Sequence, residues 1–191
     1  MNDTEQQIVN WLGKRVSEAR FLHSLGVMDV VTQLAAVHDI DQDPLRQAAL
    51  VHDCAREFTA RELLAAAGEW GLPLRDVDRQ SPVLLHGKLA VVIAERELGL
   101  SHPAMVSAVC WHTAGHPGMS LSDKLFFLAD VLEPTRPMPW VPELGAVARE
   151  DVDRAVLMAI EINTDHLDRT GRVVDPDTYA LKELLLQRLR G

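Results

Sequence analysis

Apolar residues recur along this chain at the spacing of an α-helix. Near the N-terminus, five of them share one face of a helix with about 3.6 residues per turn: Ile8, Trp11, Leu12, Val16 and Ala19. Four leucines near the C-terminus repeat the spacing: Leu181, Leu184, Leu185 and Leu189. No run alternates apolar and polar residues as a half-buried strand does. The pattern predicts an all-α fold.

Polar residues and glycines mark where the predicted helices begin and end. Pairs with the spacing of a capping box occur at three places: Thr4 with Gln7, Thr59 with Glu62, and Ser120 with Asp123. Glycine favours the residue after a helix, so Gly68 is expected to end a helix over 60–67 and Gly99 one over 83–98.

The composition says more about which partners the chain can have than about its fold. The 191 residues are 47% hydrophobic, enough for the core of one domain. Asp and Glu number 28 against 19 Lys and Arg, a formal charge of -9, and such a field repels nucleic acid polymers and anionic membranes. No apolar run approaches the roughly 20 residues that span a bilayer, and the N-terminus lacks a secretory signal. With only two cysteines, expected as free thiols, the chain is predicted to be cytoplasmic.

The adjacent pair His52-Asp53 carries the first candidate chemistry. It closes the apolar run 48–51, where a carboxylate is costly to bury without a partner. An imidazole and a carboxylate side by side can both donate to one cation, which neutralises the buried charge. The pair therefore suggests a metal site, provided that distant residues complete it.

Two further residues in apolar helical contexts can complete such a site. His23 lies among Phe21, Leu22 and Leu25, and Asp130 follows the apolar run 125–129. Together with His52 and Asp53 they give two imidazoles and two carboxylates. This mixed nitrogen and oxygen set suits Fe, Mn, Zn or Ni better than Mg, which prefers oxygen and water.

Two more histidines lie at predicted helix ends and are candidates for the same cleft. His86 is near the start of one helix and His112 near the end of another. They either bind a second metal that is bridged through Asp53 or donate hydrogen bonds to a substrate phosphate, because both kinds of site use the same residue types.

The order His23, His52-Asp53, Asp130 resembles the HD-domain superfamily of metal-dependent phosphohydrolases. The chain is most similar to its bacterial branch of symmetrical bis(5'-nucleosyl)-tetraphosphatases, which hydrolyse diadenosine tetraphosphate. Four segments carry that similarity: Arg20–Val27, Leu84–Gly87, Trp111–Ser120 and Leu128–Arg136. The resemblance implies a single HD-type helical bundle over 1–191, with its core over about 18–137 and C-terminal helices over 143–190 packing on it.

The resemblance also implies roles for particular residues. The implied metal ligands are His23, His52, Asp53 and Asp130, with His52-Asp53 as the catalytic pair. The implied ion is iron, as one or two ions, with Mn, Co, Ni or Zn as alternatives. The implied nucleotide-binding residues are Arg20, His86, His112, Thr113, Arg136, Gly171, Arg172 and Val173. Arg56 stands where such proteins commonly have Lys, which keeps the charge but changes the geometry of a phosphate contact.

The implied reaction is hydrolysis of diadenosine tetraphosphate to two ADP by metal-activated water. The implied partner is thus a small dinucleoside polyphosphate, with a homodimer left open. Two alternatives keep the same site: a hydrolase of a deoxynucleotide or a guanosine polyphosphate, and a nucleotide-sensing module with weak catalysis.

Overall fold

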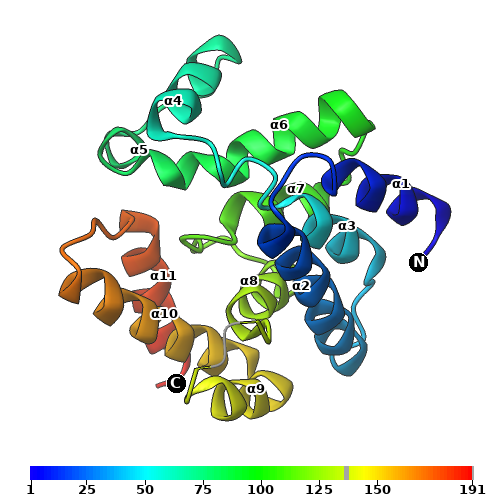
Figure 1. The fold of residues 1–191 in the computed structure, drawn as a ribbon. Coiled ribbons are helices and arrows are strands. Elements are labelled where there is room, and N and C mark those ends of the chain that lie inside the picture. The colour runs from blue at the N-terminus through cyan, green and yellow to red at the C-terminus, as the bar shows by residue number, and fades with distance from the viewer. Residues whose placement is uncertain (136–137, 191) are drawn as a thin grey trace.

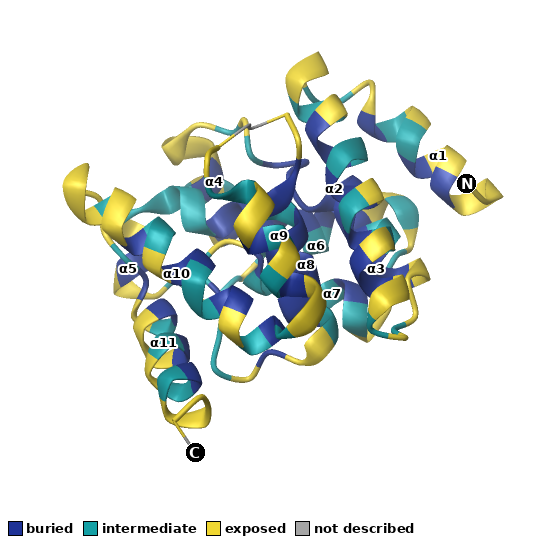
Figure 2. Cartoon of the chain, turned by 90° about the horizontal axis from the view of Figure 1, so that it is seen from below, coloured by how far each residue is buried: buried dark blue, intermediate teal, exposed yellow. Residues whose placement is uncertain are grey.

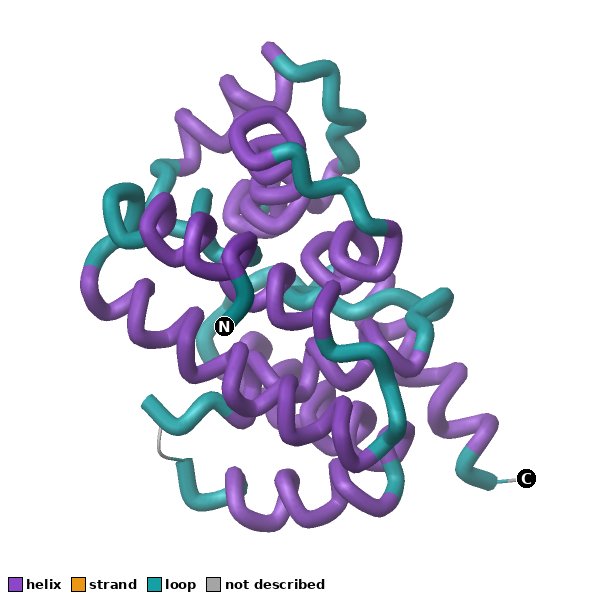
Figure 3. Tube along the Cα trace, turned by 90° about the vertical axis from the view of Figure 1, so that its right-hand side faces the viewer, coloured by secondary structure: helices purple, strands orange, loops and turns teal. Residues whose placement is uncertain are grey.

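The computed structural model describes residues 1–135 and 138–190. Within these ranges the chain forms eleven α-helices and one 3-10 helix, with no strand (Figure 3), so the all-α prediction is confirmed. The helices are α1 (Asp3–Leu12), α2 (Glu18–Val37), α3 (Asp43–Val51), α4 (Ala60–Glu69), α5 (Asp76–Gln80), η1 (Pro82–Leu85), α6 (His86–Leu98), α7 (Pro103–Trp111), α8 (Leu121–Leu132), α9 (Val141–Glu150), α10 (Val152–Arg169) and α11 (Pro176–Arg188).

The centre of the fold is a group of four helices, α2, α3, α7 and α8, which pack against one another (Figure 1). Large apolar side chains such as Phe126, Phe127 and Leu50 are fully buried between them. Helices α4, α5 and η1 lie together beside α6, whereas α10 packs on α8, α9 and α11. Figure 2 shows the buried positions concentrated in this centre, while the C-terminal end of α11 is exposed.

Two of the three predicted capping boxes are confirmed, and the first is wrong. Thr59 and Ser120 cap α4 and α8 as expected. At α1 the box is formed by Asn2 with Glu5 instead of Thr4 with Gln7. The carboxylate of Glu5 also binds Arg46 of α3 at 2.6 Å, and this ion pair favours the earlier start of the helix.

The prediction that a glycine follows the end of a helix is confirmed for one helix and wrong for another. Gly99 ends α6 with a left-handed φ of 70°. Gly68 lies inside α4, which continues to Glu69, and the left-handed residue is Gly71 with φ 67°. The C-terminal leucines are also less uniform than predicted: Leu181 and Leu185 are buried, but Leu189 is exposed. No helix among the described residues is long and apolar enough to cross a membrane.

Candidate metal centre and its cleft

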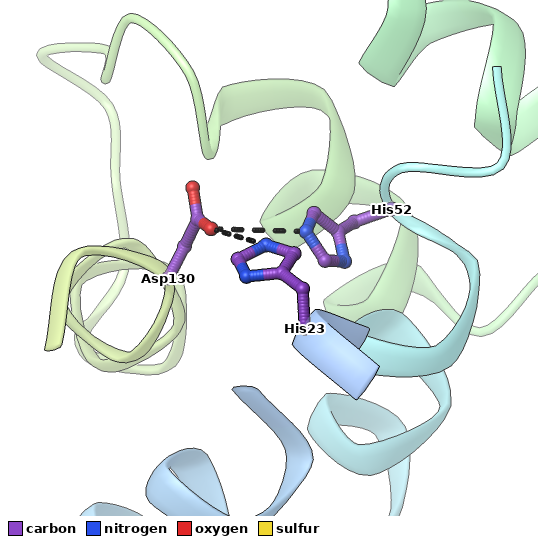
Figure 4. Close-up of side chains that lie close together, drawn as sticks. All are labelled: His23, His52 and Asp130. Carbon is purple, nitrogen blue, oxygen red and sulfur yellow. Dashed lines mark ion pairs between the residues drawn. The ribbon is translucent and has the colours of Figure 1, made fainter. Parts of the chain in front are cut away.

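The four predicted metal ligands meet in the centre of the helix group. His23 lies in the second turn of α2, His52 follows the last residue of α3, and Asp130 lies near the end of α8. Figure 4 shows His23, His52 and Asp130 pointing toward one another from these separate elements. His52 is fully buried, and His23 and Asp53 are nearly so. The fold thus brings together residues more than a hundred positions apart.

Donor atoms of His23, His52 and Asp130 all lie within 4.8 Å of one another, and so do those of His52, Asp53 and His112. Oδ1 of Asp130 lies 3.0 Å from Nε2 of His23 and 3.8 Å from Nε2 of His52. Oδ2 of Asp53 lies 3.7 Å from each of the same two nitrogens. Both nitrogens are buried, and neither makes a hydrogen bond of normal geometry with any described residue. Because buried polar atoms are nearly always satisfied, this arrangement fits a cation bound between them.

The other ring nitrogen of each site histidine is already in use. Nδ1 of His52 lies 2.9 Å from the carbonyl oxygen of Ala49, and Nδ1 of His112 lies 2.7 Å from that of Val109. Nδ1 of His86 bonds in the same way to the carbonyl of Val83 at 2.5 Å. A carbonyl only accepts, so in each ring Nδ1 carries the proton and the lone pair is on Nε2. These imidazoles are held in the form that binds metal.

His86 and His112 form a second cluster beside the first. Their Nε2 atoms are 3.0 Å apart, and Oδ1 of Asp53 lies 3.2 Å from that of His86 and 3.9 Å from that of His112. Two neutral imidazoles whose lone pairs face each other at this distance repel unless a cation or a proton lies between them. Asp53 therefore presents one oxygen to each cluster.

At four of the site residues, the electrostatics favour the protonation states that bind metal. Burial lowers the pKa of His112 to about 3, and it also lowers the pKa of His52 below its ordinary value. For Asp53, burial opposes ionisation, but the neighbouring imidazoles of His52 and His86 outweigh it and hold the pKa well below its usual range. The pKa of Asp130 is lowered in the same way, mainly by His23 against the effect of burial.

Glu133 is a member of this site that the sequence reasoning did not identify. Its carboxylate is fully buried and lies 3.0 Å from Nδ1 of His23, whereas Nδ1 of each of the other three site histidines bonds to a main-chain carbonyl. Burial lowers the pKa of His23, but Asp130 and Glu133 outweigh that effect and raise it. A Cβ on Gly26 would lie 2.4 Å from Glu133 Oε1, so only glycine leaves room for this carboxylate.

Four residues of the two clusters line an open cleft of about 540 Å³: Asp53, His86, His112 and Asp130. We call the two clusters together the floor of this cleft. Four predicted nucleotide-binding residues line it: Arg20, His86, His112 and Thr113. Arg20 binds Oδ2 of Asp53 at 2.6 Å, and Thr113 Oγ1 lies 3.1 Å from Nε2 of His112. Arg56 also lines the cleft.

On the C-terminal side, the residues that line the cleft are not the ones predicted from the sequence. Gly171, Arg172 and Val173 lie in the turn after α10 and do not line it. The wall on that side is formed by residues of α10 itself, which sequence reasoning missed because they look like an ordinary solvated helix face: Ile162, Asn163, His166 and Arg169. A nucleotide-binding role for 171–173 stays a prediction, and Arg136 lies outside the described residues.

Comparisons with known proteins find relatives over most of the chain. A family model described as "HD domain" matches residues 20–135, which include all of the predicted metal ligands. A protein of Bacillus subtilis (strain 168) named "Bis(5'-nucleosyl)-tetraphosphatase, symmetrical" is 30% identical over 87% of this chain and 89% of its own length. A protein of Halalkalibacterium halodurans with the same name is 30% identical over 91% and 92% of the two chains.

A solved structure has nearly the same fold. It is the crystal structure of a predicted HD superfamily hydrolase involved in NAD metabolism from Clostridium acetobutylicum. The two chains are 32% identical and superpose with a TM-score of 0.91, over 96% of this chain and 97% of the other. The likeness therefore extends through α9, α10 and α11, beyond the part that the family model matches.

Proposed function

The chain belongs to the HD-domain family, whose members are metal-dependent hydrolases, and from that membership we propose that it cleaves diadenosine tetraphosphate symmetrically into two molecules of ADP. The observation that carries the proposal is the convergence of the Nε2 atoms of His23 and His52 with carboxylate oxygens at the floor of an open cleft, where neither nitrogen makes a hydrogen bond of normal geometry with a described residue. Relatives that span nearly the whole chain and carry the tetraphosphatase name support the choice of substrate.

We propose that His23, His52, Asp53 and Asp130 hold one cation. His86 and His112 would share a second with Asp53, because their facing lone pairs at 3.0 Å call for positive charge. The mixed nitrogen and oxygen donors favour iron, with Mn, Co, Ni or Zn as alternatives. A divalent cation at such a site supplies Lewis acidity, which lowers the pKa of water and relieves charge on the phosphate.

The protein's own groups position the polyphosphate in this scheme. Arg20 lies at the edge of the floor, about a quarter exposed, and its guanidinium can turn from Asp53 toward a phosphate oxygen. The Thr113 hydroxyl lies beside His112 and can donate to the same anion. Two ADP form when the bond broken is the central phosphoanhydride, so the middle of the substrate must lie over Asp53 and each nucleoside to one side.

Product analysis tests this proposal. Protein purified without oxygen and supplied with ferrous iron is expected to convert diadenosine tetraphosphate to ADP alone, and Asp53→Ala is expected to lower the rate by at least about a thousandfold. Asp29→Asn, at an exposed position of α2, is the matched control and should behave as wild type.

Three outcomes would contradict the proposal. A mixture of ATP and AMP would show asymmetric cleavage. Faster hydrolysis of a deoxynucleoside triphosphate or a guanosine polyphosphate would assign the site to another nucleotide. Full activity in Asp53→Ala would place the metal site elsewhere.

A further inference from the structure

We propose that one face of α10, together with Trp140 and Met138, forms a subsite for one nucleoside of the substrate. The inference rests on the proposed function, because it assigns part of the same cleft to the base and ribose rather than to the phosphates. These residues line the cleft whose floor includes Asp53, His86 and Asp130, so a group bound here is contiguous with the metal cluster.

The helix α10 has two faces with different tasks. Its core face is buried against the rest of the fold: Val152, Ala155, Val156, Ala159 and Ile160. The cleft residues Ile162, Asn163, His166 and Arg169 have the spacing i, i+1, i+4 and i+7, which places them on one side of the helix. The second face is thus a continuous strip along the cleft.

The apolar part of this wall is left accessible. Ile162 is partly buried but does not belong to the hydrophobic core. Trp140 packs against the core on one side and lines the cleft, and the side chain of Met138 is 48% exposed. A flat, largely apolar purine fits such a wall, because aromatic and thioether groups stack on rings and pockets for small molecules are mostly apolar.

Three polar groups of the wall are unpaired within the part of the chain that the structure describes. Among the described residues, the amide of Asn163, the indole N–H of Trp140 and the ring of His166 make no hydrogen bond. An asparagine amide can donate to and accept from adenine at N7 and N6 together. A partly buried amide without a partner, beside an apolar surface, is suited to reading a base edge.

A neighbouring groove competes less well for the nucleoside. It contains Arg75 and Lys88, but Arg75 already binds Asp175 at 2.5 Å and Asp177 at 2.7 Å, and Lys88 binds Asp78 at 3.1 Å. Its cations are neutralised by carboxylates that would repel a phosphorylated ligand. On the α10 side, Arg169 is largely exposed and pairs with Asp165 alone among the described residues, one turn away on the surface.

Binding of two product analogues tests the subsite without depending on turnover. ADP and ribose 5-diphosphate, which lacks the base, are titrated calorimetrically into the metal-loaded protein. Asn163→Ala is expected to weaken ADP binding by about tenfold, and Trp140→Leu by about 10-fold to 100-fold. Affinity for ribose 5-diphosphate should stay within about twofold of wild type in both variants. Asn10→Ala, at an exposed position of α1, is the control.

The outcomes separate this inference from the proposed function. If ADP binds both variants as tightly as wild type, or if wild type binds ADP no better than ribose 5-diphosphate, the subsite is wrong. If ADP binding falls as expected but wild type does not cleave diadenosine tetraphosphate, the subsite stands and the proposed substrate is wrong. Because Trp140 also packs on the core, a fall in both affinities in Trp140→Leu marks structural damage, and Asn163→Ala then decides.

Discussion

The floor and the wall of the cleft are built in opposite ways. On the floor, every site histidine has its Nδ1 bonded within the protein, and its Nε2 faces carboxylates or another imidazole. On the wall, Trp140, Asn163 and His166 keep their polar groups unpaired among the described residues. The floor lies within residues 20–135, which the HD-domain model matches, and the wall lies outside them. If the proposed roles hold, the difference teaches that the chemistry is preset in the part matched by the family model, whereas recognition is left to side chains that can bind a ligand in place of water.

Removing a floor ligand should have the largest effect and should not depend on the substrate. Asp130→Asn takes a negative charge from the site, where Oδ1 lies 3.0 Å from Nε2 of His23. We expect loss of bound metal and a fall in kcat of about a thousandfold or more. The measurement is metal content by mass spectrometry beside rates on diadenosine tetraphosphate and on inorganic tetraphosphate, which has no base.

The wall variant Asn163→Ala is the counterpart in that experiment. It should slow only the reaction of the nucleotide and leave the rate on inorganic tetraphosphate unchanged. The division of roles between floor and wall would be wrong if Asp130→Asn slowed one of the two substrates much more than the other. It would also be wrong if Asn163→Ala slowed both substrates equally.

Substitution of Gly26, which lies against Glu133, should have an intermediate effect, and that effect should be on metal binding at the floor. In Gly26→Ala the new Cβ would lie 2.4 Å from Oε1 and 2.9 Å from Cγ of Glu133, so the carboxylate must move away from His23. Loss of a hydrogen-bonded partner behind a metal ligand typically costs 10–100-fold in metal affinity or activity. We expect a fall of about that size in a metal titration.

Two comparisons show whether the effect passes through Glu133. Gly68→Ala, inside α4 with no atom within 4 Å of the new Cβ, should leave metal affinity unchanged and stabilise the protein by about 0.5–1 kcal/mol. In the background of Glu133→Ala, the Gly26→Ala change should cost little more. A full additional loss there would mean that Gly26 acts by another route.

The smallest expected effect lies at the boundary between floor and wall. The Thr113 hydroxyl is 3.1 Å from Nε2 of His112 and 3.4 Å from that of His86, and its side chain also lines the cleft. Thr113→Val removes one hydrogen bond at nearly constant shape, so we expect kcat/KM to fall by about tenfold or less. Thr113→Ser, which keeps the hydroxyl, should restore most of the rate, and steady-state kinetics on both substrates would show any preference.

The sequence identified the floor because its ligands are unusual where they occur. A charged or imidazole residue that ends an apolar run, as at His52-Asp53 and Asp130, is conspicuous, and the structure brings these residues together with His23. Glu133 is inconspicuous by comparison, since a glutamate before a proline usually marks only a helix end. A signal was available in Gly26, because glycine inside an apolar helix costs about 1 kcal/mol relative to alanine and suggests a close approach.

The wall could not be identified from the chain alone. Asn163, His166 and Arg169 have the composition of an ordinary solvated helix face, and only the packing of α10 on α8 turns that face toward the cleft. The helix periodicity predicted that helices such as α10 exist, but not which helices they pack against. The first capping box was wrong for a related reason, since the distant Arg46 helps to fix where α1 begins.

Three of the four imidazoles are oriented by main-chain oxygen atoms, those of Ala49, Val83 and Val109. Every amino acid carries that atom, so no single codon change at these positions deletes the acceptor. His23 alone is oriented by a side chain, that of Glu133. A point mutation at Glu133 can therefore change how strongly His23 donates to a metal. No side-chain substitution removes the main-chain acceptors behind the other three histidines.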